Sequence, residues 1–273
     1  MTVAFRSDEV LPGLLHSIGN ATTGSPQVYI VNNSLEEPEL ASRLPADVAA
    51  TVIEPTENLG YGGGMNLGVA SSEASDWVLL ANPDLAFGEK AIDRLVEVGE
   101  SSSEIGIVGP LVYTPTGEIY PSARNLPSLR TGIGHAVFAR IWRTNPWTRS
   151  YLQDLEVTPH QHDAGWLSGS CLLVRRDVFE SVGGFDEKYF MYFEDVDLCA
   201  RVSQMGYRVV YAPSAIVTHE GGHSTSTVNR AMIRAHHESA YRYLAARYSA
   251  WYLAPVRAVL RVGLAVRSRI VAS

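Results

Sequence analysis

The acidic run Glu194-Asp195-Val196-Asp197 is the densest group of side chains that could transfer protons. It directly follows the aromatic and apolar segment 189–193. Because a carboxylate among apolar rings holds its proton more tightly, an acid here could serve as a general base. Neighbouring positions on a helix point in different directions, so we expect Glu194 and Asp195 to have separate catalytic roles. The alternative is that these acids only stabilise the N-terminus of a helix through its dipole.

A second candidate group combines Asn82, Asp84 and His219. Asn82-Pro83-Asp84 follows the apolar run 77–80, and His219 follows a later strand-like stretch. Ligands of open α/β sheets bind beyond the carboxyl ends of the strands, so these side chains could meet at one edge. A carboxylate and an imidazole there could hold Mg²⁺ or Mn²⁺ on a diphosphate. Alternatively, Asp84 is an ordinary turn residue that caps a helix, and His219 is a hydrogen-bonded loop residue.

The segment 58–66 is rich in glycine, which occupies positions 60, 62, 63 and 64. Glycine lets the backbone approach a ligand closely, and a helix that begins here would point its N-terminus at anionic groups. The segment matches neither the Walker loop nor the dinucleotide fingerprint. A plain tight turn is therefore the alternative interpretation.

Composition and charge restrict the classes of function. At 273 residues, with 46% hydrophobic and 19% charged residues, the chain is typical of a folded globular protein. A net charge of −7 argues against a general nucleic-acid-binding protein. The two cysteines, Cys171 and Cys199, are too few for a disulfide framework or a zinc site, and we expect both to be buried thiols.

Short apolar runs alternate with helical patterns over the first two-thirds of the chain. This alternation predicts an α/β fold with a central mixed, mostly parallel sheet. We expect strands at residues 1–5, 28–31, 51–53, 77–80, 105–108, 165–174 and 207–211. We expect helices from Leu11, capped by Ser7 or Asp8, from the glycine-rich segment to about Ser72, and from Glu194. The stretch 125–162 has weak periodicity and is typical of an excursion over the sheet.

The C-terminal part of the chain is basic, because no acid follows Glu238. Six arginines follow it instead: Arg242, Arg247, Arg257, Arg261, Arg267 and Arg269. We therefore expect a main domain over residues 1–240 and a basic helical tail over residues 241–273.

The tail has the pattern of an amphipathic helix. Its apolar face contains Val259, Val262, Val266 and Ile270, and its opposite face contains Arg257 and Arg261. Such a helix can lie on an anionic membrane surface; the alternative is that it packs on the main domain with its arginines in solvent. The sequence shows neither an apolar run of transmembrane length nor a signal-peptide pattern.

Several motifs, each loose by itself, occur in one order along residues 1–225 and together resemble the family 2 glycosyltransferases of the GT-A fold. They are the segment 58–66, Asn82-Pro83-Asp84, the segments 169–176, 183–187 and 193–198, and His219. The resemblance implies a GT-A domain that transfers a sugar from a nucleotide donor with inversion of configuration. It also implies a divalent metal cofactor, Mg²⁺ or Mn²⁺.

Further motifs resemble the actinobacterial rhamnosyltransferases of cell-wall linker synthesis. They are the segments 120–124, 145–147, 165–170, 189–192, 223–225 and 235–237. This resemblance implies dTDP-rhamnose as donor and N-acetylglucosaminyl-diphospho-polyprenol as acceptor. It implies a peripheral enzyme on the cytoplasmic face of the plasma membrane, without a nucleic-acid partner. The alternatives are a related transferase that uses another nucleotide-sugar and a catalytically inactive membrane-bound scaffold.

The resemblance also implies roles for individual residues. Asp195 matches the catalytic base, Glu194 matches a residue that contacts the acceptor, and Asp84 and His219 match metal ligands. Residues implied to bind the donor are Phe5, Asn32, Asn58, Gly60, Gly63, Asn66, Asn82 and Asp84; residues implied to contact the acceptor or phosphate are Arg124, Trp166, Ser168 and Gly169. Asn32 stands where most relatives have an aspartate, and an amide offers the nucleotide different hydrogen bonds.

Overall fold

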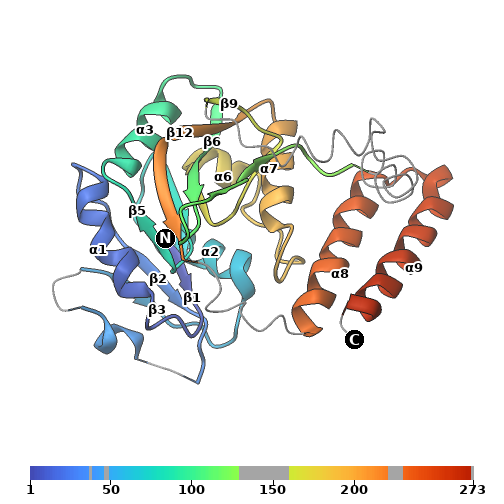
Figure 1. The fold of residues 1–273 in the computed structure, drawn as a ribbon, viewed down its shortest axis with the longest axis horizontal. Helices are drawn as coiled ribbons and strands as arrows, with labels where there is room; N and C mark the ends of the chain where they lie inside the picture. The colour runs from blue at the N-terminus through green and yellow to red at the C-terminus, as the bar shows by residue number, and fades with distance from the viewer. Residues whose placement is uncertain (37–38, 46–48, 129–159, 221–229, 272–273) are drawn as a thin grey trace.

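The computed structural model describes residues 1–36, 39–45, 49–128, 160–220 and 230–271. Figure 1 shows an α/β body and, beside it, a hairpin of two long helices near the C-terminus. Most of the expected excursion 125–162, and the segments 145–147 and 223–225, lie outside the described residues.

The N-terminal part of the body is a parallel three-stranded sheet. Its strands are β1 (Thr2–Ala4), β2 (Tyr29–Asn32) and β3 (Thr51–Ile53), in that order, which confirms the three expected strands. The helix α1 (Leu11–Ala21) connects β1 to β2. The expected cap is wrong, because Val10 occupies the N-cap position without a side-chain hydrogen bond. The Ser7 carbonyl instead accepts from the N–H groups of Val10 and Leu11, and the Ser7 hydroxyl is bonded to the Phe5 backbone.

The central sheet is mixed, as expected. The strands β4 (Trp77–Ala81), β11 (Cys171–Arg175), β6 (Ile105–Tyr113), β12 (Arg208–His219) and β5 (Leu85–Phe87) lie side by side in this order, while β7 (Ile119–Tyr120) pairs with β6 and β9 (His162–Asp163) pairs with β12. Only β6 and β12 pair in parallel here, so the expected parallel majority is absent from the described pairings of this sheet. The antiparallel β11 inserts between β4 and β6. Met1 joins the two sheets through backbone hydrogen bonds with Leu79 and Ala81.

The single strand expected over residues 165–174 is instead two strands with a turn between them. The first, β10 (Trp166–Leu167), pairs with β8 (Ala123–Arg124) in a separate small sheet. The second, β11, belongs to the central sheet. The chain turns at residues 168–170, where the Ser168 N–H donates to the Ser122 carbonyl. This break places Gly169 in the turn before β11 rather than within a strand.

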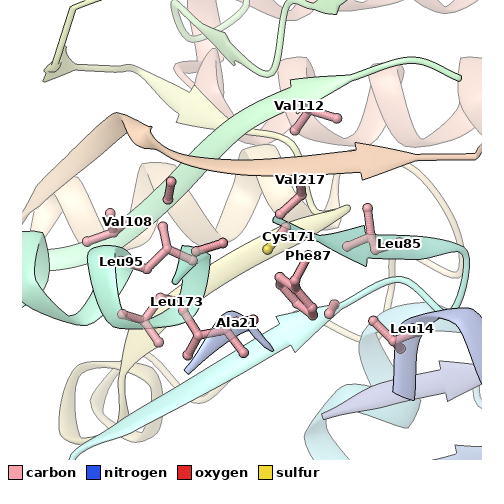
Figure 2. Packing of buried hydrophobic residues seen from close by; sticks show 14 of the residues in the cluster. Leu14, Ala21, Leu85, Phe87, Leu95, Val108, Val112, Cys171, Leu173 and Val217 are labelled. Carbon is pink, nitrogen blue, oxygen red and sulfur yellow. The ribbon is translucent and has the colours of Figure 1, made fainter. Parts of the chain in front are cut away.

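Helices cover both faces of the sheet and enclose two apolar cores. The first core lies under α1 and α3 (Ala91–Glu100), where Leu14 and Leu95 pack with strand residues such as Leu173 (Figure 2). The second lies under α2 (Gly60–Ser71), α6 (Arg176–Ser181) and α7 (Glu194–Gln204). The two cysteines are free and buried, one in each core, and burial raises the pKa of both thiols to about 12.

The C-terminal hairpin consists of α8 (Arg230–Arg247), a 3₁₀ turn (Trp251–Leu253) and α9 (Ala254–Val271). Position 240, the expected end of the main domain, lies inside α8. α8 packs on α7, since Tyr243 joins a small buried cluster with Tyr189, Val196 and Ala200. No helix among the described residues is long and apolar enough to cross a membrane.

Candidate active site

The expected acidic pair begins the helix α7, and an unusual backbone turn positions it. Tyr192 and Phe193 both have left-handed conformations, with φ values of 67° and 69°. Such conformations cost roughly 1–2 kcal/mol for a residue with a side chain, so they persist only where surrounding contacts hold them. The His236 ring contacts both aromatic rings, at centroid distances of 5.4 and 5.6 Å, and the Ser239 hydroxyl donates to the Met191 carbonyl at 3.0 Å. α8 therefore supports the turn that sets the position of the acids.

Asp195 is half-buried and held by two backbone groups. The Gly169 N–H donates to Oδ2 at 2.8 Å, and the Val196 N–H donates to Oδ1 at 2.8 Å. Burial raises the pKa of the Asp195 carboxyl, while these hydrogen bonds and the positive charge of Arg124 oppose the increase. Each carboxylate oxygen keeps a further lone pair, so an oriented base remains able to accept a proton.

Glu194 lies in different surroundings from Asp195. Its side chain is almost enclosed, with the residue 7% exposed, and its Oε2 has no hydrogen-bond partner among the described residues. Burial first, and the nearby Asp195 second, raise the pKa of Glu194 well above that of an ordinary carboxyl. We therefore expect a protonated Glu194 beside an ionised Asp195 near neutral pH, because two adjacent carboxylates do not readily ionise together.

The turn at Gly169 is fixed by a residue to which the sequence assigns no role. The hydroxyl of Tyr61, on α2, donates a hydrogen bond to the Gly169 carbonyl. The N–H of the same glycine binds Asp195, and a Cβ at this position would lie 3.2 Å from the Asp195 Cβ. Burial, followed by the charges of Glu194 and Asp195, raises the pKa of Tyr61, so its hydroxyl stays a donor. The sequence around Tyr61 gives no indication that its hydroxyl contacts Gly169, which lies far away in the chain.

The other residues expected on the acceptor side lie near Asp195. Arg124 is paired with Trp166 across the β8–β10 ladder, and its guanidinium lies 5.6 Å from the Trp166 ring centroid. The Ser168 hydroxyl donates to the Ser170 hydroxyl, immediately beside the Gly169 turn. The structure thus brings together residues from four separate parts of the sequence around one carboxylate.

The second expected group also assembles. His219, at the end of β12, places Nε2 3.0 Å from Asp84 Oδ1 and 3.3 Å from Asn82 Nδ2. The β5–β12 pairing sets this contact, because His219 is opposite Leu85 in the register. The Glu220 N–H also donates to the Asp84 carbonyl at 2.9 Å.

Asp84 and His219 fit a divalent cation by the chemistry of their donor atoms. A carboxylate oxygen and an imidazole nitrogen both suit Mn²⁺, and a carboxylate suits Mg²⁺. No cluster of three or more His, Cys, Asp or Glu that could hold a metal occurs within the described parts of the chain. A cation at this pair could complete its coordination with oxygens of a bound ligand, which is how Mg²⁺ commonly binds together with substrate phosphates.

A short backbone path connects the two groups. The Asn82 N–H donates to the Ser170 carbonyl at 2.8 Å, and Ser170 is adjacent to Gly169, which holds Asp195. A candidate metal site and a candidate base therefore lie on neighbouring segments at one edge of the sheet.

The glycine-rich segment is a packed helix rather than an open loop. Residues 60–64 form the first turns of α2 and, apart from Tyr61, are buried. A Cβ at Gly64 would lie 2.7 Å from a methyl of Val3, and one at Gly63 would lie 3.1 Å from Leu59 Cβ. The Asn58 side chain accepts from the Gly60 N–H, 2.9 Å away, and so closes the turn before the helix. These glycines are required for close packing.

The remaining residues expected to bind the donor are divided between two regions. Asn66 lies on α2, where its side chain accepts from the Phe185 N–H and donates to the Phe185 carbonyl, so it holds a turn of the chain. Asn32 is buried at the end of β2, and its Oδ1 accepts from the Ser34 N–H at 3.0 Å. Phe5 follows β1 and is exposed. Asn32 and Phe5 thus lie at the ends of strands, whereas Asn66 lies within a helix.

Replacing Gly60 by Ala should destabilise the protein by roughly 2–4 kcal/mol, since overpacking typically costs 1–3 kcal/mol and left-handed backbone about 1 kcal/mol more. Gly60 has a φ of 70°, and its new Cβ would lie 2.5 Å from the Phe190 carbonyl oxygen. Urea unfolding measures the effect. The matched control is Gly13→Ala on α1, where no atom lies within 4 Å. A Gly60→Ala protein as stable as this control would contradict the packing role.

Comparisons of the sequence with known proteins identify relatives of this chain. A sequence model described as glycosyltransferase-like family 2 matches residues 1–237. The N-acetylglucosaminyl-diphospho-decaprenol L-rhamnosyltransferase of Mycobacterium tuberculosis is 40% identical over 99% of this chain and 91% of its own length. The rhamnosyltransferase WbbL of Escherichia coli is 30% identical over 68% of this chain and 70% of its own.

The solved structures show the same architecture. The mannosyltransferase PcManGT from Pyrobaculum calidifontis, solved with GDP-Man and Mn²⁺, matches with a TM-score of 0.63 at 14% identity. The match covers 99% of this chain and 70% of that one. At this level of identity the likeness shows a shared fold.

Proposed function

The chain belongs to the family 2 glycosyltransferases and has the GT-A fold, and we propose that it transfers L-rhamnose from dTDP-rhamnose to N-acetylglucosaminyl-diphospho-polyprenol. The observation that carries this proposal is the 40% identity, over almost the whole of both chains, to an enzyme whose name states this sugar and this class of acceptor. The dTDP part of the donor rests on the resemblance of the sequence motifs.

We assign the role of base to Asp195. Its carboxylate takes the proton from an acceptor hydroxyl while that oxygen forms a bond to the anomeric carbon of rhamnose. The bond from this carbon to the diphosphate oxygen breaks, and dTDP leaves with the electron pair. The N–H groups of Gly169 and Val196 hold the carboxylate in place through the proton transfer. Glu194, kept protonated by burial, would donate a hydrogen bond to the acceptor sugar.

We assign the donor diphosphate to the opposite part of the site, beside Asp84 and His219. A divalent cation held there would supply charge neutralisation for the leaving dTDP, an effect often worth several kcal/mol. Asn82 would orient the His219 ring, because its amide lies 3.3 Å from Nε2. Asn32 and Phe5, at the ends of the neighbouring strands, are placed to contact the nucleotide.

The acceptor also determines where the enzyme would work. A polyprenyl-linked sugar stays in a bilayer, so the protein must meet the membrane surface to reach it. We propose that it does so on the cytoplasmic face, with the basic tail over residues 241–273 in contact with anionic lipid.

The test of the proposed function is transfer of radiolabelled rhamnose from dTDP-rhamnose to a short-chain N-acetylglucosaminyl-diphospho-prenol, with and without a chelator. We expect product that the chelator abolishes. Transfer from a different nucleotide-sugar alone would replace the proposed donor by another member of the class. Absence of transfer from every donor would favour the inactive scaffold.

The pH dependence of transfer should report on Asp195. A base must be deprotonated, so kcat/KM should fall as the pH drops below the pKa of Asp195. The positive charge of Arg124 lowers that pKa, so Arg124→Gln should raise it and move the acidic limb of the profile to higher pH. The control is Arg208→Gln, which removes an exposed arginine paired with Asp163. An acidic limb that does not move would show that Arg124 has no influence on the charge of the base.

A further inference from the structure

The helical hairpin carries apolar side chains on a surface that the main domain does not cover. Trp251 and Tyr252, in the turn between the helices, are 85% and 65% exposed. Val259 and Val262, on α9, are 74% and 64% exposed. We call these four residues the outer face of the hairpin. Large apolar groups that gather on one exposed surface usually mark a binding site.

The opposite side of α9 packs on α8 and uses one of its arginines internally. Arg257 donates hydrogen bonds to the carbonyls of Tyr248 and Ala250, both at 2.8 Å, and so closes the turn between the helices. Arg261 lies over the Tyr241 ring of α8 at 5.7 Å. Leu260 and Leu264 are partly buried, whereas the outer face is not. The hairpin thus keeps its own contacts on one side and leaves an apolar surface on the other.

The hairpin that carries this surface is strongly basic. Arg242, Arg247, Arg261 and Arg267 are exposed, and Glu238 is the only acidic residue in the sequence from Arg230 onward. Each arginine near an anionic bilayer adds about 1 kcal/mol of attraction. Trp and Tyr are the side chains most enriched at the level of lipid head groups.

We propose that the outer face of the hairpin inserts into the interfacial layer of an anionic lipid bilayer, with Trp251 and Tyr252 as its leading side chains. The sequence pattern predicts membrane contact through an apolar stripe along the last helix. The structure adds the aromatic residues of the turn, Trp251 and Tyr252, and it shows that Arg257 closes this turn. The side chains of Val266 and Ile270 lie outside the described residues. The bilayer as partner rests on the proposed function, which places the acceptor in a membrane.

This contact would be coupled to the site through α8. One side of α8 supports the turn before the acids, through the Ser239 hydroxyl on the Met191 carbonyl and the Tyr243 ring 5.8 Å from the Phe193 ring. α8 also packs against α9. A hairpin docked on lipid would hold Asp195 at a constant distance from the bilayer surface. The acceptor sugar is also held close to this surface, because only a diphosphate separates it from its lipid.

Vesicle binding tests the proposal without any need for activity. The full-length protein is sedimented with vesicles of phosphatidylcholine alone and with vesicles that contain phosphatidylglycerol. We expect binding to the anionic vesicles only, and we expect the variant Trp251→Ser/Tyr252→Ser to weaken it at least about tenfold. The control is Met205→Ser, which removes an exposed apolar side chain at the end of α7. Brominated lipids should quench the wild-type fluorescence more than that of the variant.

Three results would overturn the inference. The first is that the variant binds anionic vesicles as well as the wild type does. The second is that the wild type binds neutral and anionic vesicles equally. The third is that neither protein binds vesicles and that the wild type forms a concentration-dependent dimer which the variant does not form. The last result would identify a second copy of the chain as the occupant. Rhamnose transfer to a water-soluble short-chain acceptor separates this inference from the proposed function, because the variant should keep the wild-type rate there. Vesicle binding by a protein that transfers no sugar would contradict the proposed function but not this inference.

Discussion

Replacing Asp195 by Asn should lower kcat for sugar transfer by about 10²- to 10⁴-fold, the contribution typical of a general base. The amide has nearly the same shape as the carboxylate, but it cannot take the proton of the acceptor hydroxyl. Its oxygen can still accept one of the two backbone hydrogen bonds that Gly169 and Val196 now donate. We therefore expect a folded protein that still binds dTDP, which calorimetry can verify.

Two companion variants make the role of Asp195 specific. Glu194→Gln should cost less than about tenfold, because a protonated carboxyl and an amide both donate a hydrogen bond to the acceptor. Asp163→Asn removes an exposed acid that pairs with Arg208 and should leave the rate unchanged. A large loss in Glu194→Gln together with near-normal transfer by Asp195→Asn would exchange the roles of the two carboxyls.

Replacing Asp84 by Ala should abolish most transfer, with a loss of about 10²- to 10³-fold or more, because charge neutralisation at the leaving diphosphate is worth several kcal/mol. His219→Ala should act in the same direction, since its Nε2 lies 3.0 Å from the Asp84 carboxylate. Both variants should need a higher concentration of Mn²⁺ for half-maximal activity. Calorimetry should show that dTDP binds more weakly, and that a chelator weakens binding to the wild type but has little effect on the variants.

The matched control for these variants is His16→Ala, which removes an exposed histidine of α1. Its metal response should equal that of the wild type. If Asp84→Ala and His219→Ala also keep the wild-type response to Mn²⁺, the cation does not bind at this pair, and the assignment of the diphosphate to this part of the site fails.

The sequence points to most of the candidate site residues, and there is a local reason for this. Asn82-Pro83-Asp84 comes directly after the apolar strand β4, and Asn32 ends β2. Buried strands must be apolar, so a polar cluster where such a run stops marks the strand end at which ligands bind. The acids of α7 are found in the same way, because aromatic residues precede them and apolar residues follow at helical spacing.

The glycines of α2 show where this reasoning stops. Their spacing is equally compatible with a ligand loop, a tight turn and a packed helix. The choice depends on Val3, Phe185 and Phe190, which lie far away in the chain and occupy the space where side chains of α2 would be. The residue pattern within one segment does not show which distant part of the chain packs against it.

The sequence alone therefore indicated the family, the succession of the main strands along the chain and the candidates for the base and the metal ligands, because each has a local pattern. Only the tertiary structure decided how they are held. Gly169 meets Asp195 because the chain breaks between β10 and β11, and His219 reaches Asp84 across 135 positions through the register of β5 and β12. The left-handed turn at Tyr192 and Phe193 opposes the preference of both residues and persists through contacts with α8. Contacts over such separations are set by how whole elements pack, which no local propensity specifies.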